Sequence, residues 1–283
     1  MRVLVTGGAG FIGSHTVVEL VQDGHEPVVL DSLANAKRSV MDRVERITGY
    51  RVPLVVGDVR DDATLDDVFD GGRIDAVVHF AGLKAVGESV QRPLDYYDVN
   101  VSGTVRLLRA MLRHAVGTFV FSSSATVYGD PASVPLPETA ERHLPANPYG
   151  RSKLMVEHIL EDLAAANPEL RLGALRYFNP IGAHASGLIG EYPAGIPNNL
   201  MPVITQVAVE RLPKLRVFGA DYDTRDGTCI RDYIHVTDLA RGHLAALEFL
   251  RTEPGLHVWN LGTGEGTTVL ELVEAFQRIT GVR

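Results

Sequence analysis

A tyrosine and a lysine stand four residues apart in the segment Tyr149-Gly-Arg-Ser-Lys153. Side chains at this spacing lie on the same face of a helix. A free phenol has a pKa of about 10, and a nearby cation favours its ionised form. Lys153 is therefore predicted to lower the pKa of Tyr149 toward the working pH, so that the phenol can act as a base. Taken alone, such a pair is more typical of an ordinary amphipathic helix surface.

A run of serines places this pair in a chemical context. The apolar residues 118–121 predict a strand that leads into Ser122-Ser-Ser124. The carboxyl ends of parallel strands gather at the ligand-binding edge of a sheet, where a serine hydroxyl can meet the tyrosine. The predicted catalytic residues are therefore Ser124, Tyr149 and Lys153, a set typical of nicotinamide-dependent dehydrogenases.

A glycine-rich loop occupies residues 6–13, between a predicted strand at 3–5 and a helical apolar pattern. Gly7 permits the tight turn, Gly10 lets the backbone approach a pyrophosphate, and Gly13 lets the helix pack on the strand. The amino end of the helix then faces the negative charge of the phosphates. Glycines that serve only a tight turn are the alternative, but strand, loop and helix together predict a dinucleotide site.

Two carboxylates follow the next predicted strands. Asp31 ends the second strand, where it can accept hydrogen bonds from the adenosine ribose and repel a 2′-phosphate, which favours NAD over NADP. The nearby cations Lys37 and Arg38 slightly weaken the argument against NADP. A helix cap is the alternative role for Asp31. Asp58 follows the third strand, where contact with the adenine amino group and a loop or cap role are equally supported.

Short β-branched runs alternate with longer helical patterns in the first half of the chain. Because these runs are continuously apolar, both of their faces are expected to be buried, as in a parallel sheet covered by helices. The pattern predicts a Rossmann-like α/β fold with a doubly wound parallel sheet. The predicted strands lie at 3–5, 28–30, 54–56, 76–80 and 119–121.

The alternation of strand and helix patterns ends near Tyr177, after which frequent glycine and proline residues interrupt any long element. The prediction is an NAD-binding domain over 1–178, to which 229–241 and 257–262 return, and a smaller C-terminal substrate-binding region over 179–283. Helices are expected at 198–210, at 237–250 and after Thr268, whose spacing to Glu271 indicates a capping box. A further strand is expected at 257–261.

Composition narrows the class of protein. Among 283 residues, 27 Lys and Arg stand against 35 Asp and Glu, and a net charge of −8 argues against nucleic-acid binding. The one cysteine, Cys229, excludes an intrachain disulfide and fits a reducing, cytoplasmic setting. We expect no membrane contact, because neither a signal peptide nor a transmembrane run is present in the sequence. We expect no metal either, because His79, His235 and His243 have irregular spacing.

Longer stretches of the sequence resemble the UDP-glucose 4-epimerase family, in the extended branch of the short-chain dehydrogenase/reductase superfamily. The likeness implies that Tyr149 removes the proton of the sugar C4 hydroxyl, that Ser124 hydrogen-bonds the same oxygen, and that Lys153 also holds the nicotinamide ribose. It implies interconversion of UDP-glucose and UDP-galactose through oxidation by NAD to a 4-keto intermediate, rotation and re-reduction. The matching stretches are residues 79–89, 122–129, 177–180, 195–202 and 231–235.

The resemblance also implies two sets of binding residues. Without it, Phe80 and Phe178 are equally consistent with the core, and Arg231 with a surface ion pair to Asp232. The implied NAD-binding residues are Gly7, Gly10, Phe11, Ile12, Gly13, Asp31, Asn35, Asp58, Val59, Phe80, Ala81, Gly82, Lys84, Asn100, Tyr149, Lys153 and Phe178. The implied residues for the UDP-hexose substrate are Lys84, Ser124, Tyr149, Asn179, Asn199, Leu200, Phe218 and Arg231.

The sequence departs from the family pattern at two places. Val99 stands where asparagine is common, while Asn100 keeps its usual structural role. Family members normally continue for several dozen residues beyond the position of Arg283 and supply another phosphate-binding arginine. Because Arg231 is then the only matched cation for the diphosphate, we expect weaker UDP binding and nearly unchanged NAD binding. By resemblance alone, we expect a homodimer formed through residues 93–114 and 149–166.

Two other functions compete with this interpretation. A sugar-nucleotide 4,6-dehydratase or decarboxylase of the same superfamily also uses Asp31, Tyr149 and Lys153. A dehydratase needs a carboxyl acid and base for elimination, whereas Ser124 is followed here by Ala125 and Thr126. A non-catalytic protein that senses dinucleotides would need the glycine loop but not the catalytic set.

Overall fold

The computed structural model describes residues 1–130, 133–193, 195, 197 and 199–282. Within these residues the larger sheet has seven strands in the order β3-β2-β1-β4-β5-β6-β9, and all neighbours run parallel. This confirms the predicted Rossmann-like doubly wound fold. The strands are β1 (Arg2–Thr6), β2 (Glu26–Asp31), β3 (Leu54–Val56), β4 (Ala76–His79), β5 (Thr118–Ser124), β6 (Arg171–Tyr177) and β9 (Gly255–Leu261).

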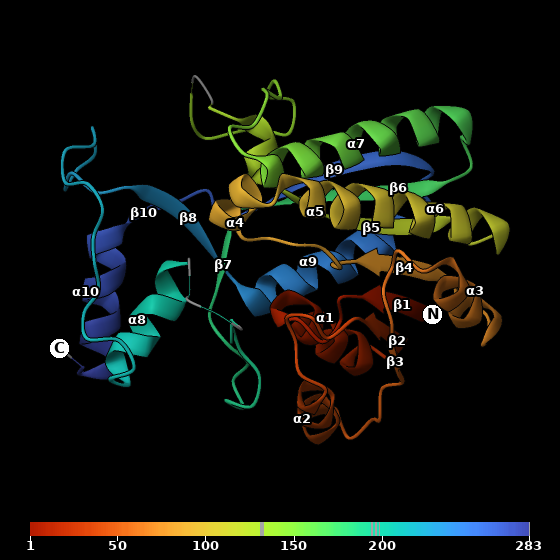
Figure 1. The fold of residues 1–283 in the computed structure, drawn as a ribbon, viewed down its shortest axis with the longest axis horizontal. Helices are drawn as coiled ribbons and strands as arrows, with labels where there is room; N and C mark the ends of the chain where they lie inside the picture. Colours follow the sequence, from red (N-terminus) through yellow and green to blue (C-terminus); the bar gives the residue numbers. More distant parts are fainter. Residues whose placement is uncertain (131–132, 194, 196, 198, 283) are drawn as a thin grey trace.

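Helices cover both faces of the larger sheet (Figure 1). Helices α1 (Phe11–Gln22), α2 (Ser39–Thr48) and α9 (Val236–Phe249) lie on one face, where α1 contacts both α2 and α9. The other face carries α3, the short helices α4 and α5, a π-helical turn, α6 and α7. Their bounds are α3 (Asp62–Asp70), α4 (Val86–Gln91), α5 (Pro93–Tyr97), the π-helical turn (Asp98–Ser102), α6 (Gly103–Arg113) and α7 (Pro148–Ala166).

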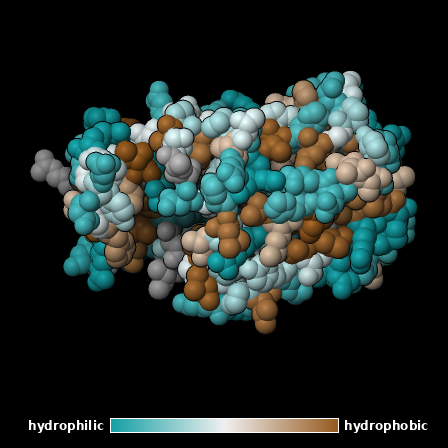
Figure 2. Space-filling view, turned by 90° about the horizontal axis from the view of Figure 1, so that it is seen from above, coloured by the Kyte–Doolittle hydropathy of each residue, from teal (hydrophilic) through white to brown (hydrophobic). Residues whose placement is uncertain are grey.

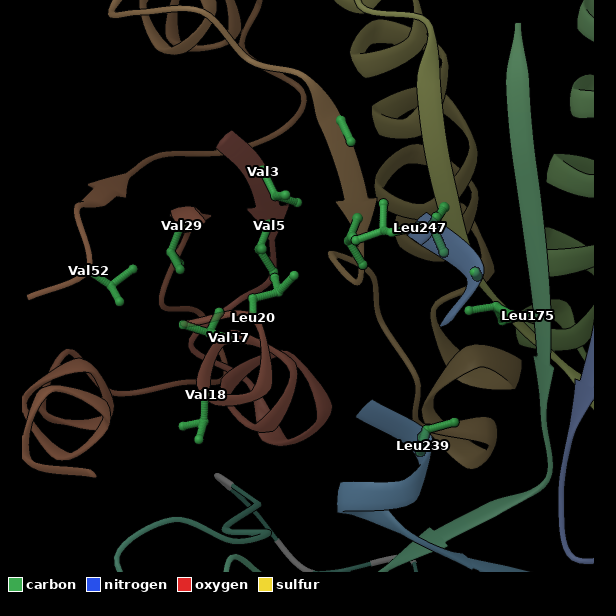
Figure 3. Packing of buried hydrophobic residues seen from close by; sticks show 14 of the residues in the cluster. Val3, Val5, Val17, Val18, Leu20, Val29, Val52, Leu175, Leu239 and Leu247 are labelled. Carbon is green, nitrogen blue, oxygen red and sulfur yellow. The ribbon is translucent and has the colours of Figure 1, made fainter. Parts of the chain in front are cut away.

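Two hydrophobic clusters bind these helices to the sheet. Val3 and Val5 of β1 lie on one side with helix residues such as Leu20 of α1, as Figure 3 shows. Leu4 points to the opposite side and joins the cluster that includes Leu160 of α7. Because alternate residues of a strand face opposite sides, β1 is apolar on both, and each fully buried side chain contributes about 1.5–3 kcal/mol.

A smaller sheet forms at one end of the molecule (Figure 1). Its strands β7 (Asn179–Ile181), β8 (Ile230–His235) and β10 (Gly266–Thr268) lie in the order β10-β8-β7. Helices α8 (Leu200–Ala208) and α10 (Val269–Thr280) lie at the same end. Of the residues predicted to return to the NAD-binding domain, β9 joins the larger sheet, whereas β8 pairs with β7 and β10.

Most predicted elements of the second half are present. The strand at 257–261 is confirmed by β9, and the helix at 237–250 is confirmed by α9, within two residues at each end. Helix α10 has the predicted capping box between Thr268 and Glu271. The helix predicted over 198–210 is shorter, spanning Leu200–Ala208, and Asn198 lies outside the described residues, as does Arg283.

The fifth strand is longer than predicted, and this matters for the site. Strand β5 continues beyond residue 121 through Ser124, because Ser122, Ser123 and Ser124 pair in register with Leu175, Arg176 and Tyr177 of β6. Hydrogen bonding to a neighbouring strand thus outweighs the low strand propensity of serine. As a result, Ser124 is fixed at the carboxyl edge of the sheet rather than in a loop.

Candidate functional site

A cleft of about 2370 Å³ runs along the carboxyl ends of the larger sheet and reaches the smaller sheet. It brings together all the predicted binding and catalytic residues except Asn100. Those that line it are Gly7, Gly10, Phe11, Ile12, Gly13, Asp31, Asn35, Asp58, Val59, Phe80, Ala81, Gly82, Lys84, Ser124, Tyr149, Lys153, Phe178, Asn179, Asn199, Leu200, Phe218 and Arg231.

The glycine loop packs so closely on neighbouring backbone that two of its positions have no space for a side chain. Gly7 has a φ of +70°, and a Cβ there would lie 2.7 Å from the backbone nitrogen of Ala81. A Cβ on Gly13 would collide with the carbonyl oxygen of Gly7. Gly10 caps α1 without a side-chain hydrogen bond, so the first N–H groups of the helix remain available to an anion in the cleft.

Asp31 is buried and tied to the glycine loop. Its carboxylate accepts hydrogen bonds from the backbone N–H of Ala9 at 3.0 Å and of Leu33 at 2.8 Å. Burial raises the pKa of Asp31, and the two backbone hydrogen bonds oppose that rise. Helix α2 begins at Ser39 with Arg38 as its N-cap residue, so the alternative that Asp31 caps this helix is wrong.

Asp58 lines the cleft but is already paired with a cation. Arg60 donates to its carboxylate from Nε at 3.0 Å and from Nη2 at 2.7 Å, and these bonds lower the pKa of Asp58. The N-cap residue of α3 is Asp61, which accepts from the N–H of Ala63. The cap alternative for Asp58 is therefore wrong.

Two lysines on the cofactor side of the cleft contact the segment that precedes α8. The Nζ of Lys84 donates to Oε1 of Glu191 at 2.9 Å, and Asn199 donates to the same oxygen at 3.2 Å. The Nζ of Lys37 lies 4.5 Å from the ring centroid of Tyr192. Sequence reasoning missed Glu191, because no motif spacing linked it to Lys84.

The catalytic corner consists of Ser124, Tyr149 and Lys153. The side chain of Asn147 caps α7 by accepting from the N–H of Gly150 at 2.9 Å, which fixes the first turn of the helix that carries Tyr149. The Nζ of Lys153 lies 5.9 Å from the ring centroid of Tyr149 and donates to the carbonyl oxygen of Ser122 at 2.7 Å. The three predicted catalytic side chains therefore converge on one part of the cleft.

The electrostatics of this corner differ from the prediction. Burial lowers the pKa of Lys153 to about 8. Burial also raises the pKa of Tyr149, which a hydrogen bond with Ser124 opposes. The expectation that Lys153 lowers the pKa of Tyr149 is wrong, because desolvation of the phenolate dominates.

Asn100 lies behind the wall of the cleft, in the π-helical turn. Its Oδ1 accepts from the backbone N–H of Leu83 at 2.7 Å, and its Nδ2 donates to the carbonyl oxygen of Leu83 at 3.0 Å. It is buried and does not line the cleft, whereas its neighbour Val99 does. Asn100 therefore shapes the loop after β4, in line with its expected structural role, and the structure does not bring it to the predicted cofactor surface.

Phe80 contacts both the cleft and the hydrophobic core. It lines the cleft, and its ring lies 4.7 Å from that of buried His243, so it also packs against the core. His243 in turn contacts the hydroxyl of Tyr177, another tyrosine among the cleft-lining residues that sequence reasoning missed. Phe178 lines the same part of the cleft, so both phenylalanines present one side to a ligand.

The histidines considered as metal ligands have other partners. His79 is buried between the hydroxyls of Thr6 and Thr104, and burial lowers its pKa to about 3. His235 caps α9 by accepting from the N–H of Thr237 at 3.2 Å. In the described part of the chain, no group of three or more His, Cys, Asp or Glu side chains has a metal-binding arrangement.

The described helices also include none that is long and apolar enough to cross a membrane.

The substrate side of the cleft carries exposed cations. Arg231 in β8 donates to the carbonyl oxygen of Ile230 at 2.7 Å, while Asp232 accepts from Thr263. The surface ion pair between Arg231 and Asp232 is therefore not formed. Lys214 and Arg216 also line the cleft, so the expectation of a single matched cation missed two candidates for a diphosphate.

Comparison with known proteins shows what this chain is similar to. Residues 3–262 match the model of the NAD dependent epimerase/dehydratase family. The chain is 56% identical to the UDP-glucose 4-epimerase of Pasteurella multocida, over all of this chain and 84% of that protein. It is 57% identical to the UDP-glucose 4-epimerase of Yersinia pestis, over 99% of this chain and 83% of that protein.

Solved structures agree with this similarity. The UDP-glucose-4-epimerase of Stenotrophomonas maltophila, crystallised with NAD and formylated UDP-arabinopyranose, superposes with a TM-score of 0.97 at 55% identity, over all of this chain and 84% of that one. The UDP-glucose 4-epimerase of Bifidobacterium longum, in complex with NAD⁺ and UDP, gives 0.96 at 50% identity, over 99% of this chain and 84% of that one.

Proposed function

The chain belongs to the NAD dependent epimerase/dehydratase family, and from this membership we propose that it is an NAD-dependent isomerase that interconverts UDP-glucose and UDP-galactose. The observation that carries the proposal is the convergence of Ser124, Tyr149 and Lys153 in a cleft that also contains a glycine loop. Inversion at C4 requires a base for the C4 hydroxyl and a hydride acceptor close to it, and this cleft has room for both.

The loop before α1 fits a dinucleotide. Gly7 and Gly13 let the loop pack directly on neighbouring backbone, where a Cβ would collide, and the uncapped helix start that lines the cleft supplies N–H donors and a positive dipole end. We propose that Asp31 accepts hydrogen bonds from the adenosine ribose and that Asp58 lies at the adenine. Lys84 and Phe178 would complete the binding of the nicotinamide half. When bound, NAD⁺ supplies the hydride acceptor and donor, together with a positive charge.

The chain itself supplies the proton chemistry. We propose that the Tyr149 phenolate accepts the proton of the C4 hydroxyl and returns it after the hydrogen has been restored on the other face of C4. The hydrogen bond from Ser124 favours the phenolate, because it lowers the pKa of Tyr149 against the opposing effect of burial. Lys153 adds a cation in a dry environment, where its field is weakly screened.

The substrate is held best by its UDP moiety. Inversion requires the sugar to present both faces of C4 in turn, so strong bonds to the sugar hydroxyls would oppose the reaction. Arg231, with Lys214 and Arg216 nearby in the cleft, offers the charge that a diphosphate needs. Asn179, Asn199, Leu200 and Phe218 are proposed to contact the nucleotide and the sugar.

A dehydratase or decarboxylase is less well supported. In the structure Ser124 is followed by a 3-10 turn, and its Oγ accepts from the N–H of Thr126 at 3.2 Å and from the Thr126 hydroxyl at 3.0 Å. No carboxyl pair follows the serine in this turn, as elimination would need. A purely dinucleotide-sensing role leaves the buried catalytic corner without a purpose.

We further propose that two copies associate through α5, α6 and α7. Large apolar side chains are exposed on this part of the surface, including Leu94, Leu112 and Met155. Figure 2 views the molecule from the side of α7 and shows apolar residues interspersed with hydrophilic ones over this face. Equilibrium sedimentation of the purified protein would report the association directly.

The remaining proposals concern organisation and location. We propose an NAD-binding domain over 1–178, completed by returning segments from 229–241 and 257–262, and a substrate-binding region over 179–283. The free Cys229 and the acidic composition fit a cytoplasmic protein without a nucleic-acid partner.

The test is an assay of the purified protein with UDP-galactose, followed by proton NMR of the anomeric signals. We expect UDP-glucose to accumulate to equilibrium without stoichiometric NADH. A 4-keto-6-deoxy product would indicate a dehydratase, and bound NAD without turnover of any UDP-hexose would indicate a sensor. Tyr149→Phe is the matched inactive control.

A further inference from the structure

A buried ion pair lies behind the catalytic corner. The guanidinium of Arg176 on β6 donates to Glu157 on α7 from Nη2 at 2.7 Å and from Nε at 3.0 Å. Their side chains are only 4% and 2% exposed. Taking two charges out of water is costly, so such a pair is weak evidence for stability, and in some proteins its role is to fix one arrangement of packed elements.

The ion pair is connected to the strand that ends in the catalytic serine. The hydroxyl of Ser123 donates to Oε1 of Glu157 at 2.5 Å. Glu157 follows Tyr149 by eight residues and Lys153 by four, so all three lie on the same face of α7. Glu157 therefore joins the helix that carries the phenol to the residue directly before Ser124.

A second arm of the network reaches the wall of the cleft. Arg176 also donates to the hydroxyl of Tyr128 at 2.9 Å, and Tyr128 donates to Oδ1 of Asn260 at 2.7 Å. Asn260 then donates from Nδ2 to the carbonyl oxygen of Leu136, which lines the cleft. The network thus ties β5, β6, α7 and β9 together around the catalytic corner.

We infer that Glu157 and Arg176 are positioning residues, which hold β5 and α7 in one register so that the Ser124 hydroxyl stays within reach of the Tyr149 phenol. Neither side chain lines the cleft, so both act through the residues that they hold. The inference rests on the proposed function, because the epimerase reaction provides its readout.

The inference has a specific kinetic consequence. The hydrogen bond from Ser124 lowers the pKa of Tyr149, whereas burial raises it. A looser register between β5 and α7 weakens that bond, so the pKa of Tyr149 rises and less phenolate is present at a given pH. We therefore expect kcat to fall and its pH profile to move to higher pH, while KM for UDP-galactose changes little.

The decisive variant is the double substitution Glu157→Leu with Arg176→Met. It replaces the pair by apolar side chains of similar volume, and Arg142, which also contacts Glu157 at 3.2 Å, keeps its ion pair with Glu161 at 2.8 Å. No buried charge is then left unpaired, so the fold should survive. We expect kcat to fall about 10- to 100-fold, KM to stay within about twofold, and the pH profile to shift upward. The control replaces the exposed pair Glu248 and Arg251 in the same way and should leave all these quantities unchanged.

A milder variant tests the same inference if the double variant does not fold. Ser123→Ala removes the link between Glu157 and β5 but keeps the ion pair, and Ser123→Thr should restore the hydroxyl and the wild-type pH profile. A wild-type protein that fails to convert UDP-galactose would overturn the proposed function. The inference alone would be overturned by a different result: the wild type is active, the double variant folds, and both it and Ser123→Ala keep the wild-type kcat and pH profile.

Discussion

The cofactor side and the substrate side of the cleft are built in different ways. On the cofactor side, Asp31 and Ser124 are each only 8% exposed and are held by hydrogen bonds to neighbouring backbone or side chains. On the substrate side, Phe218 is 80% exposed, and Arg231 donates only to a backbone carbonyl among the described residues. One side is part of the core, and the other lies on the surface.

Because of this difference, substitutions on the two sides should have different effects on the stability of the fold and on the affinity for ligands. Residues of the cofactor side and the catalytic corner belong to the same packed structure as the larger sheet, so their substitution affects chemistry and folding together. Residues of the substrate side make few internal contacts, so their substitution should change ligand binding alone, because exposed positions rarely alter stability by more than about 0.5 kcal/mol.

The largest effect is expected for Tyr149→Phe. The ring still packs in the catalytic corner, but the proton acceptor is gone, so kcat should fall by about 10³-fold or more. The amount of NAD bound per chain should stay the same, as measured by cofactor extraction and absorbance. Turnover close to that of the wild type would remove Tyr149 from the reaction.

A smaller effect is expected for Asp31→Ala. The variant loses charge-assisted hydrogen bonds to the ribose, so NAD affinity should fall about 10- to 100-fold. NADP affinity should fall less, because the repulsion of a 2′-phosphate is lost at the same time. Calorimetry with both cofactors measures this, and the exposed Asp23→Ala is the matched control. An unchanged ratio of the two affinities would exclude Asp31 from the site.

The core of the cofactor side should also make stability depend on pH. Burial lowers the pKa of His79 to about 3 and of His243 to about 4, below the value of about 6.5 in an unfolded chain. The unfolded chain therefore binds more protons between these values, and stability is lost as the pH falls below about 6.5. Each histidine should contribute a loss of about 2 kcal/mol between pH 7 and pH 5.

Urea unfolding at pH 7 and at pH 5 tests this expectation. His243→Gln keeps a group that can accept from Tyr177 but does not titrate, so this variant should lose less stability on acidification than the wild type. The same loss in both proteins would show that His243 is not the source of the pH dependence.

The smallest effect is expected on the substrate side. Arg231→Met should weaken UDP binding about tenfold, the usual cost of losing one charge-assisted contact with phosphate. The melting temperature and the NAD affinity should remain those of the wild type, because Arg231 is exposed. Arg278→Met, on the exposed side of α10, serves as the control. A drop in melting temperature for Arg231→Met alone would contradict the proposed separation.

The cofactor side could be predicted from the sequence because its rules are local. The glycine spacing, the strand before it and the carboxylate at the end of the next strand are neighbours in the chain, and the structure gathers them in one cleft. The catalytic corner required the further rule that strand carboxyl ends share one edge. Both rules depend on backbone geometry that the sequence pattern encodes directly.

The residues that were missed depend on contacts between distant segments. Glu191 meets Lys84 across more than one hundred positions in the chain, and Arg176 meets Glu157 from a different element. No spacing in the sequence indicates such pairs. The raised pKa of Tyr149 was also unpredictable, since the sequence shows the nearby lysine but not the depth of burial.

The most direct test of the central claim is to follow the hydrogen at C4. UDP-galactose that carries deuterium at C4 is incubated with the purified protein, and the product is analysed by NMR and mass spectrometry. If hydride leaves and returns within one closed site, UDP-glucose should form with the deuterium still at C4 and with none exchanged into water. Absence of UDP-glucose, or a product whose C4 hydrogen comes from the solvent, would contradict the account.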